Sequence, residues 1–148
     1  MFQPDKNITR GEFALMVARW MGLDLASYSN VELPFADASS IASWALDGMK
    51  AMYAEGIIKG SLDSGTLVVR ANDSISRAEA MTILGRIQDK GYVRSELTFS
   101  DAGDVASWAL PYVQSLVGQG IISGYDNQLR PNDPVKRGEV AKMLYCML

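Results

Sequence analysis

The stretch FADASSIASWALDGMKAMYAEGIIKG (35–60) returns without gaps as FSDAGDVASWALPYVQSLVGQGIISG (99–124), 64 residues further along the chain. Self-similarity at a fixed period indicates a repeat architecture, so this pair decides the fold. The positions that coincide are Phe35/Phe99, Asp37/Asp101, Trp44/Trp108, Gly56/Gly120 and Gly60/Gly124.

A second segment follows each copy and also repeats. LRPNDPVKRGEVAKMLYCML (129–148) matches FQPDKNITRGEFALMVARWM (2–21) and VRANDSISRAEAMTILGRIQ (69–88), which aligns Arg10, Arg77 and Arg137. The last two arginines are 60 residues apart, so the middle repeat has four extra residues in its loop. We therefore predict one domain over 1–148 that holds the second half of repeat 1 (2–22), repeat 2 (35–91) and repeat 3 (99–148), joined by linkers at 23–34 and 91–98.

The spacing of apolar residues predicts two helices in each repeat, helix A in the first segment and helix B in the second. Apolar residues follow the i, i+3, i+4, i+7 pattern of an amphipathic helix in both segments. Helix A should end before Gly56 and Gly120, the usual place for a glycine after a helix, and Pro111 places the start of one copy close to Trp108. A short extended segment should follow, in a mainly α fold.

The three aligned arginines lie in the first turn of helix B, where the helix dipole disfavours a cation. Thr9 with Glu12, and Ser76 with Glu79, have the spacing of a capping box. Lys136 interrupts the box in repeat 3, where Glu139 would act alone. The box does not explain the arginines.

Two interpretations of the arginines stay open. One is an internal salt bridge, with Asp37 or Asp101 as partner. The other is an external anion, held by the guanidinium together with free N–H groups of the helix N-terminus. Trp44, Trp108 and Tyr125 would suit a sugar ring beside such an anion, although the tryptophans could instead pack between repeats.

Composition narrows the function further. A net charge of −3 and a pI near 4.9 argue against nucleic-acid binding, and no apolar run is long enough to span a membrane. Without histidine, and with Cys146 as the sole cysteine, the chain lacks the residues of hydrolase triads and most zinc sites. The loops lack the acidic spacing of a calcium site. We predict no catalytic residue, metal or cofactor, and no signal peptide in this chain.

The order Phe-x-Asp, Trp-Ala, Gly-Ile-Ile-x-Gly and then Arg-x-Glu resembles the S-layer homology (SLH) repeat over nearly the whole chain. Phe99, Asp101, Trp108, Gly124 and Arg137 are among the residues that carry it in repeat 3. The resemblance implies a pseudo-threefold helical bundle with grooves between repeats, on an exported protein that is anchored to the bacterial cell wall. Its ligand would be a secondary cell-wall polysaccharide, commonly with pyruvylated sugars. By the resemblance, the anchors of the charged sugar would be Arg10, Arg77 and Arg137, and the groove-lining residues would be Trp44, Trp108, Gly60 and Gly124. We add Tyr125, Asp37 and Asp101 as further candidate contacts.

This sequence departs from the family pattern in three ways. Ala71 replaces a proline, Lys136 replaces Thr or Ser, and helix A of the first repeat is absent. The absent helix would leave the apolar face of helix 9–21 with no covering partner from its own repeat. The chain is then a fragment, the helix lies in sequence not shown, or a second chain supplies it in a homodimer.

Three functions follow from these alternatives. The first is an extracellular cell-wall anchor that binds anionic glycan. The second is a structural or protein-interaction repeat in which the arginines form internal salt bridges. The third, which we disfavour, is a glycosidase that uses Asp37 and Asp101, because a catalytic acid repeated in each unit would be unusual.

Overall fold

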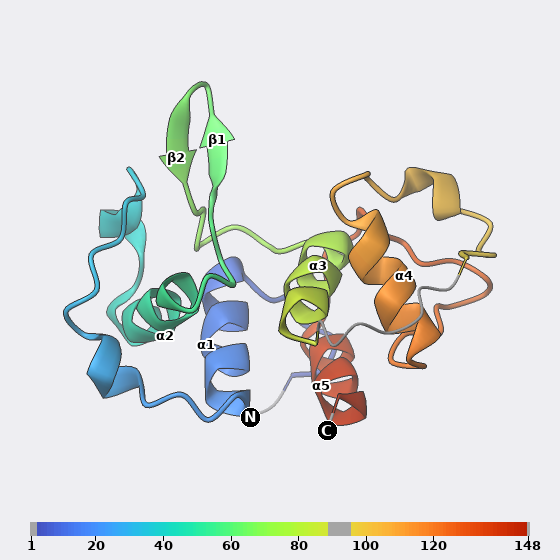
Figure 1. Cartoon of the computed structure of the whole chain (residues 1–148), viewed down its shortest axis with the longest axis horizontal. Coiled ribbons are helices and arrows are strands. Elements are labelled where there is room, and N and C mark those ends of the chain that lie inside the picture. The colour runs from blue at the N-terminus through green and yellow to red at the C-terminus, as the bar shows by residue number, and fades with distance from the viewer. Residues whose placement is uncertain (1–2, 89–95, 148) are drawn as a thin grey trace. The chain divides into compact units, whose positions relative to one another are not determined.

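The protein is described by a computed structural model that covers residues 3–88 and 96–147 (Figure 1). Within these residues it has five α-helices, a two-stranded sheet and three short 3-10 helices, so the predicted mainly α class is confirmed. The linker predicted at 91–98 lies mostly outside the described residues. The α-helices are α1 (Arg10–Trp20), α2 (Ser43–Ala54), α3 (Arg77–Ile87), α4 (Leu110–Gly118) and α5 (Arg137–Cys146). The 3-10 helices are η1 (Leu25–Tyr28), η2 (Ala38–Ser40) and η3 (Ala102–Asp104).

The chain divides into two compact units. One unit, Ile8–Ser74, contains α1 and α2, and we call it the α1–α2 unit. The other begins at Ile75, contains α3, α4 and α5, and includes the residues up to Asn7; we call it the α3–α5 unit. Each unit thus joins helix B of one repeat to helix A of the next.

Helix pairing follows this division. In the α1–α2 unit, α1 packs along α2, and Phe13, Ala14 and Val17 of α1 are fully buried. The cover that the apolar face of helix 9–21 was not expected to receive from its own repeat is supplied by helix A of the following repeat, which packs against it. A homodimer stays a prediction, but an uncovered α1 no longer supports it.

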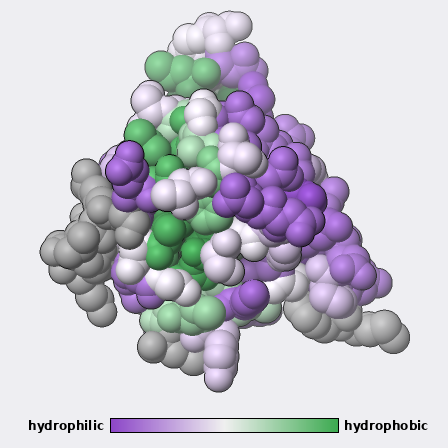
Figure 2. Space-filling model, turned by 90° about the vertical axis from the view of Figure 1, so that its right-hand side faces the viewer, coloured by the Kyte–Doolittle hydropathy of each residue, from purple (hydrophilic) through white to green (hydrophobic). Residues whose placement is uncertain are grey.

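In the α3–α5 unit, α3 packs along α4 in the same way. A Cβ on Gly85 of α3 would lie 2.6 Å from the Cβ of Tyr112, so glycine permits the close approach of the two helices. Val113 and Leu116 of α4 are fully buried, while Leu110 and Val117 are half-buried. Figure 2 shows a band of hydrophobic residues at the surface beside hydrophilic ones.

The helix ends confirm the predictions made from local sequence. The Thr9 and Ser76 hydroxyls each accept the N–H of the glutamate three residues on at 3.1 Å, and each glutamate accepts the cap N–H at 3.1 Å. In α5, Glu139 acts alone and accepts the Lys136 N–H at 2.8 Å, because a lysine side chain has no acceptor. Gly56 and Gly120 follow α2 and α4 with φ of 73° and 75°.

The loop of repeat 2 that holds the four extra residues forms a β-hairpin, where the sequence predicted only a longer loop. Strands β1 (Ser61–Asp63) and β2 (Thr66–Val68) pair antiparallel around a Ser64–Gly65 turn, and Figure 1 shows the hairpin projecting beyond the helices of its unit. In repeat 3 the same loop closes with one bridge, Tyr125 to Gln128. Three-residue strands are too short for an alternating pattern to reveal them.

Candidate functional site

The N-terminus of each helix B is closed by backbone hydrogen bonds from the loop before another helix B. In α1, the N–H groups of Arg10 and Gly11 donate to Asp73 and Ala71 at 2.9 and 2.8 Å. In α3 the acceptors are Asp133 and Pro131, and in α5 they are Lys6 and Pro4. In α1 and α3 these bonds and the cap hydroxyls together occupy the amides that a helix start leaves open. The expectation of free N–H groups for an anion is therefore wrong for α1 and α3, whereas α5 has no cap hydroxyl to accept the Glu139 N–H.

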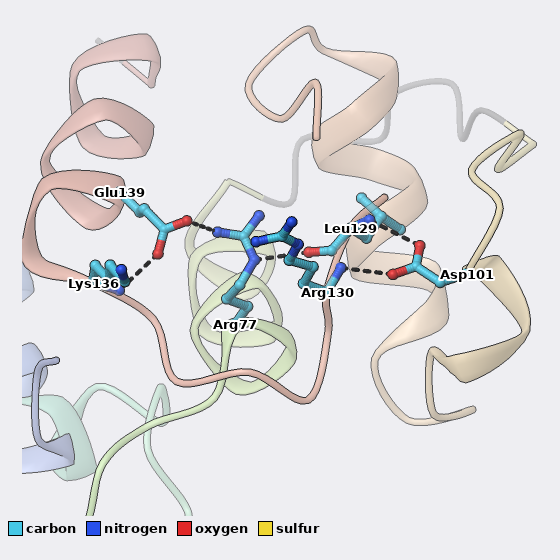
Figure 3. A network of polar contacts seen from close by, with 6 residues as sticks. All are labelled: Arg77, Asp101, Leu129, Arg130, Lys136 and Glu139. Atoms are coloured by element: carbon cyan, nitrogen blue, oxygen red, sulfur yellow. Dashed lines mark hydrogen bonds and ion pairs between the residues drawn. The ribbon is translucent and has the colours of Figure 1, made fainter. Parts of the chain in front are cut away.

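Arg77 is the best-defined of the three arginines. Its side chain is 6% exposed, its Nε donates to the Leu129 carbonyl at 2.7 Å, and its Nη1 forms an ion pair with Oε2 of Glu139 (Figure 3). The other oxygen of Glu139 accepts the Lys136 amide. The predicted internal salt bridge thus exists for Arg77, but its partner is the capping glutamate of the next repeat, not an aspartate.

Tyr125 stacks on this arginine. The guanidinium carbon of Arg77 lies 5.3 Å from the centre of the Tyr125 ring, within the range of a cation–π contact. Burial raises the pKa of the Tyr125 phenol, and the Glu139 carboxylate raises this pKa further. The phenol therefore stays neutral and able to donate a hydrogen bond, while 45% of Tyr125 remains exposed.

Arg77, Tyr125 and Glu139 line a shallow, open pocket at the surface of the α3–α5 unit. Lys142 and Met143 of α5 line another part of it, and the loop after α4 supplies the rest of the wall. We call this the Arg77 pocket. Its remaining lining residues are Ile121, Ile122, Ser123 and Gly124.

Gly124 is required by the backbone of this loop. It has a φ of 76°, and a Cβ there would lie 2.6 Å from the Phe99 ring and 2.7 Å from the Gln128 carbonyl. Gly60 occupies the same position against Phe35 in the α1–α2 unit. Both glycines let the loop turn tightly over a phenylalanine ring, which is buried for Phe35 and half-buried for Phe99.

The repeated aspartates brace the same loops from the other side. The two carboxylate oxygens of Asp101 accept the N–H groups of Leu129 and Arg130 at 2.8 Å each (Figure 3). Asp37 accepts those of Val69 and Arg70 at 3.0 and 2.9 Å. Burial alone would raise the pKa of Asp101, but the two amides outweigh it and lower this pKa.

The other predicted site residues lie outside the Arg77 pocket. Arg10 is half-buried in the α1–α2 unit and its Nη1 donates to the Ser74 carbonyl at 3.3 Å. Arg137 is half-buried at the start of α5. Trp44 and Trp108 are 56% and 54% exposed, so burial between repeats does not describe them. The structure brings together Arg77, Gly124 and Tyr125 of the predicted set.

Sequence reasoning missed Glu139 and Lys142 as members of the site. Glu139 is assigned only as a cap, although a capping carboxylate has a second oxygen to offer. Lys142 stands where α1 and α3 have Leu15 and Thr82, so comparison of the repeats could have singled it out as the one cation at this position.

None of the helices among the described residues is both long and apolar enough to cross a bilayer. The S-layer homology domain profile matches residues 1–14, 34–81 and 98–141, and the chain belongs to this family. Among its relatives are a cellulosome-anchoring protein of Acetivibrio thermocellus and an amylopullulanase of Thermoanaerobacterium thermosulfurigenes, each 31% identical over 153 residues. A surface-layer 125 kDa protein of Lysinibacillus sphaericus is 29% identical over 147 residues.

These matches cover 97%, 99% and 95% of the present chain, but only 32%, 8% and 12% of the respective relatives. The chain thus spans a third or less of each of these proteins.

Proposed function

We propose that this chain is a non-catalytic cell-wall anchoring module that binds an anionic secondary cell-wall polysaccharide at the bacterial surface. The ligand we propose is a pyruvylated sugar, whose ketal places a carboxylate on a sugar ring. The names of the relatives support anchoring, since they include a cellulosome-anchoring and a surface-layer protein. They also include an enzyme, which the chain matches over only 8% of its length.

The observation that carries the proposal is the stacked Arg77–Tyr125 pair at the Arg77 pocket. A guanidinium can bind a carboxylate, and an exposed aromatic ring can pack against the apolar face of a sugar. We assign Arg77, Tyr125 and Gly124 to this contact. Asp101 supports the loop, and Asp37 supports the equivalent loop of repeat 2.

The remaining predicted residues would contact the polysaccharide outside the Arg77 pocket or shape the loops. Arg10 and Arg137 would contact other parts of the polymer, and the exposed faces of Trp44 and Trp108 would stack on further sugar units. Gly60 shapes the repeat 2 loop as Gly124 shapes that of repeat 3.

Replacing Tyr125 tests the pocket with little risk to folding. Arg77→Ala would leave Glu139 without its partner, and breaking such a buried pair costs about 3–5 kcal/mol, so lost binding could reflect unfolding. Tyr125→Ala removes a half-exposed ring and should weaken binding by about 1 kcal/mol, roughly fivefold. Calorimetric titration with purified, pyruvylated wall polysaccharide measures the change.

Tyr145→Ala is the matched control, because Tyr145 is 76% exposed on α5 and does not line the pocket. It should bind like the parent chain. If the Tyr125 and Tyr145 variants bind the polysaccharide with equal affinity, the Arg77 pocket is not part of the binding site. No binding by the parent chain would refute the glycan-binding function.

A second candidate function is a protein-interaction repeat with structural arginines. The Arg77–Glu139 ion pair favours it, because this arginine already has an internal partner. Under this hypothesis the parent chain would not bind the polysaccharide in the same titration.

A further inference from the structure

The pocket residues that occur in every copy of helix B, Arg77 and Glu139, do not by themselves give the Arg77 pocket a charge that attracts an anion. Arg77 and Glu139 form an ion pair of side chains that are 6% and 16% exposed. Both oxygens of Glu139 are engaged, one by Arg77 and one by the Lys136 amide. The arginine and its glutamate therefore contribute a net charge near zero, and Glu139 repels an incoming carboxylate.

Lys142 supplies the charge that this pair lacks. It lines the same pocket, is exposed, and lies one helical turn after Glu139 on α5. Within residues 3–88 and 96–147, its ammonium makes no ion pair with a carboxylate. Among the side chains that line the pocket it is thus the cation not already neutralised by an internal contact.

The position of Lys142 is particular to repeat 3. The equivalent residues, Leu15 in α1 and Thr82 in α3, carry no charge. Tyr125 also has no counterpart, since Ser61 follows Gly60 in repeat 2. The aromatic ring and the uncompensated cation therefore occur together in the pocket that repeat 3 forms with Arg77 of repeat 2.

We propose that Lys142 is the specificity-determining residue that makes this pocket select a sugar bearing a carboxylate over a neutral sugar. Arg77 then orients the ligand through its fixed guanidinium and through Tyr125, while Lys142 provides the net attraction. This inference rests on the proposed glycan-binding function and names the residue that reads the ligand's charge.

The test compares two forms of one purified wall polysaccharide, native and treated with mild acid to hydrolyse the pyruvyl ketal. Lys142→Gln should bind the native polymer about fivefold more weakly than the parent chain, the range of an exposed ion pair. It should bind the ketal-free polymer as the parent does, and its affinity should depend less on salt because one charge contact is lost. Lys142→Arg should keep most of the affinity for the native polymer.

Lys136→Gln is the matched control. It removes the same charge from the N-cap of the helix that carries Lys142, but Lys136 does not line the pocket, and its backbone N–H is the group that bonds to Glu139. It should bind the native polymer within about twofold of the parent, since an exposed charge outside the pocket is screened by solvent and salt.

Other outcomes overturn the inference in distinguishable ways. If the parent prefers the native polymer and Lys142→Gln keeps that preference, Lys142 does not read the carboxylate, although the glycan-binding function stands. The same holds if Lys142→Gln weakens both polymers equally, or if Lys136→Gln weakens binding as much. If the parent does not prefer the native polymer, recognition of an anionic sugar fails and this inference fails with it.

Discussion

At the scale of single residues, Asp101 shows how a short motif fixes a loop. Its carboxylate holds the amides of Leu129 and Arg130, and Arg130 has a φ of 53°, in the left-handed region that most residues avoid. Asp37 holds Arg70 at 52° in the same way. The charged hydrogen bonds offset the backbone strain, which keeps the loop that carries Tyr125 in place.

We predict an acid-dependent contribution from Asp101 to stability. The pKa of its carboxyl is lowered in the folded protein, so the contribution is present above the unfolded pKa near 3.9 and is lost as pH falls through the folded pKa. Asp101→Asn should lower the free energy of unfolding by about 1–2 kcal/mol at pH 7, because an amide offers one acceptor oxygen. The deficit should shrink at pH 3, as measured by urea unfolding.

Asp104→Asn controls for the loss of charge. Asp104 is exposed in η3, and neither of the two loop amides donates to it. Its replacement should change the free energy of unfolding by less than about 0.5 kcal/mol. A deficit of Asp101→Asn that is the same at both pH values would contradict the bracing role of its carboxylate.

At the scale of elements, the three copies of helix B differ in how their N-termini are capped, so their caps can be compared within one protein. Ser76 completes the capping box of α3, whereas Lys136 leaves that of α5 half-formed. Ser76→Ala should destabilise the protein by about 1 kcal/mol, and Lys136→Ser should stabilise it by about 0.5–1 kcal/mol because it adds a hydroxyl acceptor. Thermal unfolding followed by circular dichroism reports both changes.

The variant Lys136→Ala distinguishes the effect of adding a capping hydroxyl from the effect of removing the lysine. It supplies no acceptor, so it should not reproduce the gain expected of Lys136→Ser. If serine and alanine at position 136 raise the melting temperature equally, the gain comes from removing the charge, and the capping explanation is wrong.

Local sequence was enough to predict the helices, because their signals lie within a few residues of each end. Thr9, Ser76, Gly56 and Gly120 mark those ends by hydrogen bonding and backbone conformation alone. The pairing of α1 with α2 was not predictable in this way, since it joins two different repeats. The helix N-terminal amides likewise looked free because their acceptors, such as Asp73, are distant in sequence.

The residues of the candidate site also fall into those predictable from the sequence and those that depend on tertiary structure. Arg77, Gly124 and Tyr125 were predicted because they stand at repeated positions or beside them. Glu139 was predicted as a helix cap, but its ion pair with Arg77 depends on tertiary structure and was not predicted. Lys142 breaks the repeat, and a search for similarity between copies passes over such a difference.

At the scale of the whole molecule, the repeats are similar in fold and unequal in chemistry. Repeat 3 contributes Tyr125 and Lys142, whereas the matching positions before it are Ser61, Leu15 and Thr82. A chain with three equivalent arginines could thus still hold its anionic ligand mainly at one pocket. Anchoring through this pocket therefore requires that the chain as a whole distinguish a charged polysaccharide from a neutral one.

The most direct measurement is the dissociation constant of the parent chain for native wall polysaccharide and for the same polymer after removal of its pyruvyl ketals. Hydrogen bonds to a charged group contribute about 1.5–3 kcal/mol, so we predict binding to the native polymer that is at least about tenfold tighter. Equal dissociation constants for the two polymers, or no binding to the native one, would contradict the claim that this module anchors through an anionic sugar.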